Sequence, residues 1–114
     1  KRRQFLDVPD NSCASVEGLA TAYRTLRNGQ DKPAALLSTL RGWISEMMPR
    51  SRALQIRPGM TQLTRDDGTM ATSKKLAAYA GAFLVATGVP RTQLDVTGHC
   101  LSALLRMQKA GLAG

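Results

Sequence analysis

The sequence predicts an all-α fold, a compact bundle of four main helices with an irregular basic lobe between the second and the third. Amphipathic stretches carry most of the apolar residues, and basic side chains outnumber acidic ones 16 to 8. At 114 residues the chain can bury one core but not two. We therefore expect a basic tail or linker over residues 1–14 and a single helical domain over residues 15–114.

The first two helices are predicted to form an antiparallel hairpin. The first begins at Ser15, a residue type that caps helices, and ends at Asn28-Gly29. The second follows Asp31 and ends at Pro49, and Trp43 is expected to fill much of the shared interface. The apolar stripes are Val16, Leu19, Ala20, Tyr23 and Leu26 in the first helix and Leu36, Leu37, Leu40, Trp43, Ile44 and Met47 in the second.

Periodicity disappears over residues 50–71, where turn signals favour a short hairpin, an extra short helix or an irregular lobe. A third helix is predicted from Thr72 or Ser73 to Gly88, and a fourth after Val89-Pro90. Their inward residues are expected to be Leu76, Tyr79, Ala80, Phe83 and Leu84 in the third helix and Leu94, Thr97, Leu101, Leu104 and Leu105 in the fourth.

Six basic residues in and beside this irregular segment form a candidate nucleic-acid site. Guanidinium groups can bind phosphate through two parallel hydrogen bonds, and the two lysines open a predicted helix, where backbone N–H groups favour anions. A formal net charge of +8 makes phosphate contact with DNA or RNA plausible without base specificity. The alternative is a solvated surface that Asp66 and Asp67 partly neutralise. The six residues are Arg50, Arg52, Arg57, Arg65, Lys74 and Lys75.

The connection between the last two predicted helices, Gly88 to Leu94, has some features of a helix-turn-helix. A glycine permits the sharp turn, and Arg91, Thr92 and Gln93 could meet base edges. The same residues also fit an ordinary helix end followed by proline, and we favour that interpretation.

Catalysis finds little support, and we predict no enzyme, no metal site and no cofactor. His99 is the only histidine, and on a helix its side chain points about 100° away from that of Cys100. The glycines form neither a P-loop nor a dinucleotide fingerprint. Cys13 and Cys100 could form at most one internal bridge, but they are more simply interpreted as small buried hydrophobes, which favours a reducing, cytoplasmic compartment.

Four methionines suggest a second class of function, a protein-interaction domain of a larger protein. Flexible thioether side chains repack around partner helices, and the basic lobe would suit an acidic protein partner as well as a phosphate backbone. No apolar run is long enough to cross a membrane, and small residues on the third helix could serve a homodimer. The leading hypothesis remains a non-enzymatic nucleic-acid-binding or nucleoprotein-assembly module. The four methionines are Met47, Met48, Met60 and Met70.

Overall fold

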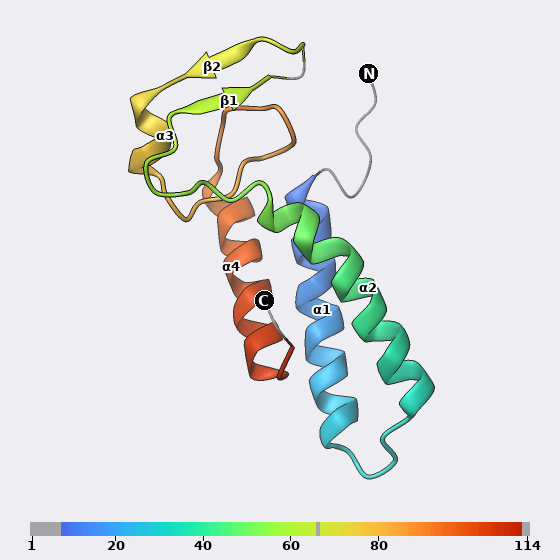
Figure 1. The fold of residues 1–114 in the computed structure, drawn as a ribbon. Coiled ribbons are helices and arrows are strands. Elements are labelled where there is room, and N and C mark those ends of the chain that lie inside the picture. Colours follow the sequence, from blue (N-terminus) through green and yellow to red (C-terminus); the bar gives the residue numbers. More distant parts are fainter. Residues whose placement is uncertain (1–7, 66, 113–114) are drawn as a thin grey trace.

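A computed structural model of the chain describes residues 8–65 and 67–112. The described part is mostly helical, with four helices and a two-stranded sheet (Figure 1). Three long helices form a bundle in which α1 packs against both of the others, and the remaining elements form a lobe at one end. The elements are α1 (Pro9–Asn28), α2 (Ala34–Arg52), β1 (Gln62–Thr64), β2 (Met70–Thr72), α3 (Lys74–Ala78) and α4 (Leu94–Lys109).

The first helix begins six residues before the predicted cap at Ser15. Pro9 occupies the first helical position, where its missing N–H group is not needed, and Asp10 complements the positive end of the helix dipole. Ser12 and Cys13 are fully buried in this first part of α1. Residues 9–14, which were predicted to belong to a tail, are therefore part of the helix, whereas residues 1–7 lie outside the described part.

The antiparallel pairing of α1 with α2 agrees with the prediction, but the position of Trp43 does not (Figure 1). Leu40, Ile44 and Met48 form the buried face of α2, and Trp43 on its flank is 47% exposed. The predicted end at Pro49 is also wrong, because the backbone N–H of Ala53 donates to the Pro49 carbonyl and α2 continues to Arg52.

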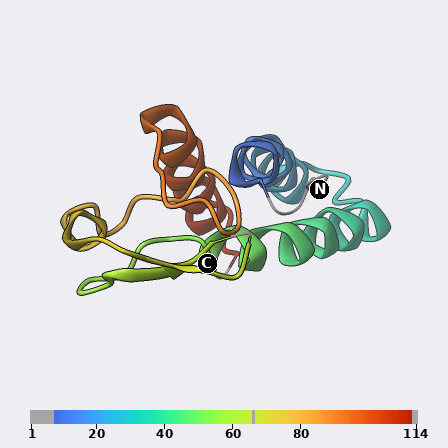
Figure 2. The same ribbon diagram turned by 90° about the horizontal axis from the view of Figure 1, so that it is seen from above.

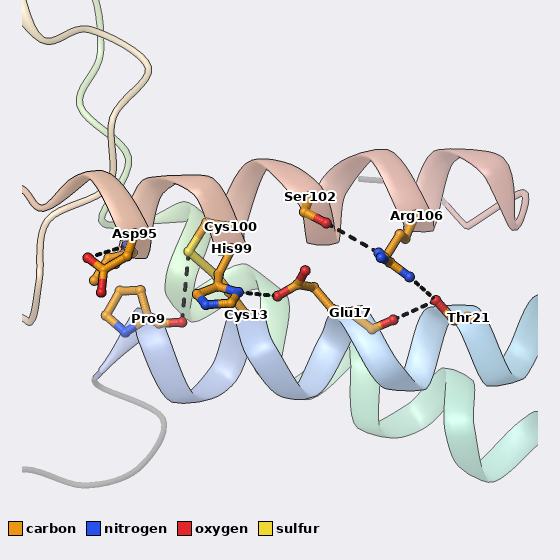
Figure 3. A network of polar contacts seen from close by, with 10 residues as sticks. Pro9, Cys13, Glu17, Thr21, Asp95, His99, Cys100, Ser102 and Arg106 are labelled. Atoms are coloured by element: carbon orange, nitrogen blue, oxygen red, sulfur yellow. Dashed lines mark hydrogen bonds and ion pairs between the residues drawn. A yellow bond between two sulfur atoms is a disulfide. The ribbon is translucent and has the colours of Figure 1, made fainter.

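Helix α4 runs parallel to α1, and a disulfide joins Cys13 to Cys100 (Figures 1 and 3). Both cysteines are buried, as predicted, but they are paired in a disulfide, so the preferred interpretation of them as unpaired hydrophobes is wrong. The face of α4 that packs on α1 carries small or slender side chains, which allow the close approach that the disulfide requires. The leucines predicted to face inward, Leu94, Leu101 and Leu105, are exposed, and the residues buried in their place are Val96, Cys100, Ala103 and Met107.

The lobe replaces the predicted third long helix. Helix α3 ends at Ala78, and Gly81 adopts a φ of +96°, which an L side chain rarely tolerates and which turns the chain out of the helical path. Between Gly81 and α4 the chain forms no helix: it reverses through a turn at Gly88, and Leu84 pairs with Thr92 in an antiparallel bridge. The described chain around Gly88 therefore does not form a helix-turn-helix. A short hairpin was one of the predicted alternatives for residues 50–71, and β1 and β2 form an antiparallel one. Its strands differ from the two expected runs, residues 53–56 and 60–63, because the second strand is residues 70–72.

Phe83 anchors the lobe to the bundle. Its side chain is fully buried in the bundle core, its backbone pairs with Gln55, and its N–H donates to Oγ1 of Thr97 on α4 over 3.0 Å. A second, smaller core around Ile56, Leu76 and Leu84 fills the lobe itself. Figure 2 shows the lobe reaching away from the three long helices on one side.

Candidate functional site: a groove between α2 and the lobe

Of the six predicted phosphate-binding residues, the structure brings two into one site. Arg52 and Arg57 line a groove between α2 and the lobe. Arg50 is two residues from Arg52 on the same helix, so its side chain leaves α2 about 160° around the axis, away from the groove.

The remaining basic residues of that set belong to the far part of the lobe. Nη1 of Arg65 donates to Oγ1 of Thr69 and to the carbonyl of Met70, each over 3.3 Å, and so braces the β-hairpin. Lys74 is exposed at the start of α3, and the side chain of Lys75 lies outside the described part. The described side chains of the proposed phosphate site are therefore divided between separate surfaces.

The groove has a volume of about 1060 Å³ and is lined by three separate stretches of chain, within residues 41–58, 80–81 and 107–112. One face of α2, the chain that follows it, the turn before Phe83 and the end of α4 each form part of the lining. Its floor is apolar and nearly buried, since the four residues that form it are at most 4% exposed. They are Ile44, Met48, Ile56 and Met107.

Three arginines, Arg41, Arg52 and Arg57, stand along the groove, and none of the described residues that line it is acidic. The guanidinium carbon of Arg41 lies 6.0 Å from the centre of the Tyr23 ring, a cation–π contact that positions the side chain. Arg41 and Arg52 are eleven residues apart on one face of α2, which corresponds to about 16 Å along the helix. The groove therefore combines an apolar floor with a positively charged rim.

Hydrogen bonds fix the lobe side of the groove. Nε2 of Gln55 donates to the Gly81 carbonyl over 3.0 Å, and the backbones of Ile56 and Gly81 are joined over 2.8 Å. Ile56 also donates to the Ala82 carbonyl over 2.8 Å. This wall is consequently formed before any ligand arrives, which lowers the entropic cost of binding.

The methionines predicted to form one interaction edge have different positions. Met48 lies on the groove floor, and Met47 packs against the bundle core. Met60 packs in the lobe core, whereas Met70 on β2 is 53% exposed. Only Met48 of this set lines the groove.

Sequence reasoning missed Arg41. The residues Arg41, Ser45, Met48 and Arg52 recur at four-, three- and four-residue steps, so they share one face of α2. That spacing was visible in the sequence, but the segments that close the groove lie at distant positions along the chain. Nothing in the local pattern indicated that this face would meet Ile56 and the end of α4.

A second, smaller cleft between α1 and α4 contains the cations Arg24, Arg106 and Lys109. Arg106 donates from Nη1 to Oγ1 of Thr21 over 2.6 Å and from Nε to Oγ of Ser102 over 3.2 Å (Figure 3). The cleft lies toward the C-terminal ends of two parallel helices, where basic side chains complement the negative end of each dipole. These contacts explain Arg106 as a structural feature of the α1–α4 pair.

His99 and Glu17 form an ion pair at the same interface, with Nδ1 of His99 2.5 Å from Oε1 of Glu17 (Figure 3). The hydrogen bond and charge of Glu17 raise the pKa of His99. Partial burial opposes ionisation of Glu17, but Ser102, His99 and Arg106 outweigh it and lower the pKa of that carboxyl. Because Cys100 is in the disulfide, it cannot pair with His99 as a nucleophile.

Within residues 8–65 and 67–112, no group of three or more histidine, cysteine or acidic side chains could hold a metal ion. No helix in that part of the chain is both long and apolar enough to cross a membrane. No protein-family model matches the chain, and neither curated proteins nor solved structures show a match to it.

Proposed function

We propose that this chain is a non-enzymatic protein-interaction domain whose groove binds an acidic amphipathic helix of a partner protein. The observation that carries the proposal is the combination of an apolar floor with three rim arginines in a groove whose described lining contains no carboxylate. An amphipathic helix with a Leu-type stripe and flanking Glu or Asp residues is complementary to both features.

The dimensions of the groove support a helical occupant. Its volume of about 1060 Å³ lies at the upper limit of the roughly 300–1,000 Å³ typical of small-molecule pockets. The α2 face between Arg41 and Arg52 is about 16 Å long, which equals three turns of a partner helix. Such a helix presents apolar side chains at i, i+4 and i+7, enough to cover the floor.

The energetics predict a moderate affinity. Each large apolar side chain buried on the floor contributes about 1.5–3 kcal/mol, and each exposed ion pair at the rim about 0.2–1 kcal/mol. Lost translational and rotational freedom offsets a large part of this sum. We therefore expect dissociation constants of roughly micromolar size for a single peptide.

Nucleic-acid binding stays a prediction, but the structure limits which basic residues could contact the same stretch of phosphate backbone. The groove arginines Arg52 and Arg57 are separated from Arg50 and from the hairpin residue Arg65, so a phosphate backbone would have to contact several surfaces. An apolar floor also adds nothing to phosphate recognition. These two features favour the protein-partner alternative.

The disulfide bears on where the domain works. Disulfides persist in oxidising compartments and are rare in the cytosol, where thiols are kept reduced. The bond between Cys13 and Cys100 therefore favours an oxidising environment over the cytoplasmic one that the sequence suggested.

The test is a fluorescence-anisotropy titration with a labelled synthetic helix that carries leucines at i, i+4 and i+7 and glutamates on its flanks. We expect saturable binding, whereas a peptide of the same composition with a scrambled order should bind at least about tenfold more weakly. A mixed-sequence DNA duplex of similar length serves as the polyanion comparison.

A matched pair of variants locates the binding site. Arg52→Glu should weaken peptide binding by about tenfold, since it places a negative charge on the groove rim. Arg50→Glu makes the same change in net charge on the same helix turn, and its affinity for the peptide should stay within about twofold of that of the unmodified chain. Equal losses in both variants, or tighter binding of the DNA than of the peptide, would contradict the proposal.

A further inference from the structure

Helix α4 presents a stripe of leucines to solvent. At 100° per residue, Leu94, Leu101 and Leu105 fall within about 40° of one another, directly opposite the buried face centred on Ala103. Leu94 is 91% exposed, Leu105 57% and Leu101 43%. Three large apolar side chains on the outer face of one helix exceed the scattered exposure that a soluble surface normally shows.

Gly98 lies within this stripe and has no packing reason inside the molecule. A Cβ atom placed there would meet nothing within 4 Å, and the residue has ordinary helical backbone. Glycine in a helix interior costs about 1 kcal/mol relative to alanine. Gly18 in α1 and Gly42 in α2 also have open space around them, but Gly98 lies beside the leucine stripe, where the missing side chain leaves room for a second helix.

The charges that flank the stripe have opposite signs at its two ends. Asp95 is exposed in the first turn of α4 and Lys109 in the last, fourteen residues or about 21 Å apart. Both lie on the same side of the leucine stripe. A surface with an apolar centre, an acid at one end and a base at the other is complementary to itself when it is turned around.

We propose that two copies of this chain pair through α4, with the two α4 helices antiparallel. In that arrangement Leu101 of each copy packs against Leu105 of the other near the two-fold axis. Asp95 of each copy then lies opposite Lys109 of the second copy, which gives two equivalent ion pairs. The contact is confined to one helix face, below the size of a standard stable interface, so the dimer is weak and depends on concentration.

The surface is distinct from the peptide-binding groove. Met107, the α4 residue on the groove floor, lies about 140° around the helix from the centre of the leucine stripe. Both surfaces can therefore be occupied at once, and the inference does not depend on the proposed function. A domain that dimerises through α4 would present two grooves to a partner.

The experiment is sedimentation equilibrium of the disulfide-bonded chain across roughly two orders of magnitude in concentration. The unmodified chain should pass from monomer to dimer. Asp95→Lys and Lys109→Asp should each weaken dimerisation by about tenfold, because each places like charges opposite one another. Asp31→Lys makes the same change in charge as Asp95→Lys, but in the α1–α2 loop, and should leave dimerisation unchanged.

An equal mixture of the two charge-reversed variants is decisive. In a mixed dimer the lysine introduced at position 95 of one copy faces the aspartate introduced at position 109 of the other. The native Asp95 and Lys109 meet at the opposite end, so both ion pairs are satisfied. We expect the mixture to recover the dimerisation of the unmodified chain, and circular dichroism of each variant alone confirms that it folds. A chain that stays monomeric at every concentration, or a mixture as weak as its components, would overturn the proposal.

Discussion

His99 on α4 and Glu17 on α1 form an ion pair one helical turn from the disulfide between Cys13 and Cys100. The parallel pair of helices is thus joined by a covalent bond and, one turn further along α1, by an ionisable contact. Arg106 extends the polar contacts by donating to Thr21 one turn further along α1 (Figure 3). Together these contacts define the register in which α1 and α4 align.

The ion pair predicts a pH dependence of stability. The raised pKa of His99 means that its contribution is complete below the unfolded value of about 6.5 and is lost as pH rises through the folded pKa. The lowered pKa of Glu17 means that its contribution is present above the ordinary value of 4.5 and is lost as pH falls through the folded pKa. Stability from this pair is therefore greatest between pH 4.5 and about 6.5.

The measurement is the Tm at pH 5.5 and at pH 8.5 for the unmodified chain and for His99→Gln. The unmodified chain should lose more stability at the higher pH than the variant does. Asp10 and Asp95 also raise the pKa of His99, but less than Glu17 does. Asp10→Asn should therefore only slightly reduce the difference in Tm between pH 5.5 and pH 8.5. The same pH dependence in both the unmodified chain and His99→Gln would contradict this account.

Removal of the disulfide should destabilise the fold. The bond joins residues 87 positions apart, and loss of a native disulfide from a small domain costs about 2–5 kcal/mol. Cys13→Ala combined with Cys100→Ala should therefore lower the urea midpoint, and a reducing agent should lower that of the unmodified chain but not of the variant. A midpoint unchanged by reduction would show that the bond does not form in solution.

Gly98→Ala should stabilise the monomer. The added Cβ meets nothing within 4 Å and improves helix propensity, so the gain approaches 1 kcal/mol, or roughly 3–6 °C in Tm for a domain of this size. The measurement belongs at low protein concentration, where self-association is negligible. A lower Tm would mean that Gly98 is packed inside the folded chain.

Replacing Phe83 by alanine should cost more stability than replacing Trp43, although tryptophan is the larger side chain. Phe83 is fully buried between the lobe and the bundle, so Phe83→Ala should cost about 3–5 kcal/mol. Trp43 is 47% exposed, and Trp43→Ala should cost well under half of that. Chemical denaturation measures both, and iodide should quench the fluorescence of Trp43 in the folded chain. Equal costs for the two substitutions would contradict the assignment of Phe83 as the anchor of the lobe.

The long helices could be predicted from periodicity, but the buried side of α4 could not. Leu94, Leu101 and Leu105 formed the larger apolar stripe, and side-chain size suggested that this stripe faces the core. The structure buries the slimmer stripe that contains Cys100 and Ala103, because a disulfide needs α1 and α4 close together. The sequence alone did not reveal that the two cysteines are paired.

The lobe and the groove were less predictable for a different reason. Gly81 ends the helical path with a positive φ, yet the same residue type at Gly88 gave an equally good local signal for a helix end. Arg52 and Arg57 were predicted to be binding residues from their charge, whereas the floor formed by Ile56 and Met107 depends on long-range packing. The α2 face of the groove has a local pattern, but its meeting with two stretches that are distant in sequence does not.

The most direct test of the groove is a two-dimensional amide NMR titration of the chain with the acidic amphipathic peptide. We expect the largest shifts on the α2 face from Arg41 to Arg52, at Ile56 and at Gly81, with little change at the hairpin residue Thr64. Shifts confined to the hairpin and α3, or no shifts at peptide concentrations that saturate the anisotropy signal, would contradict the assignment of this groove as the binding site.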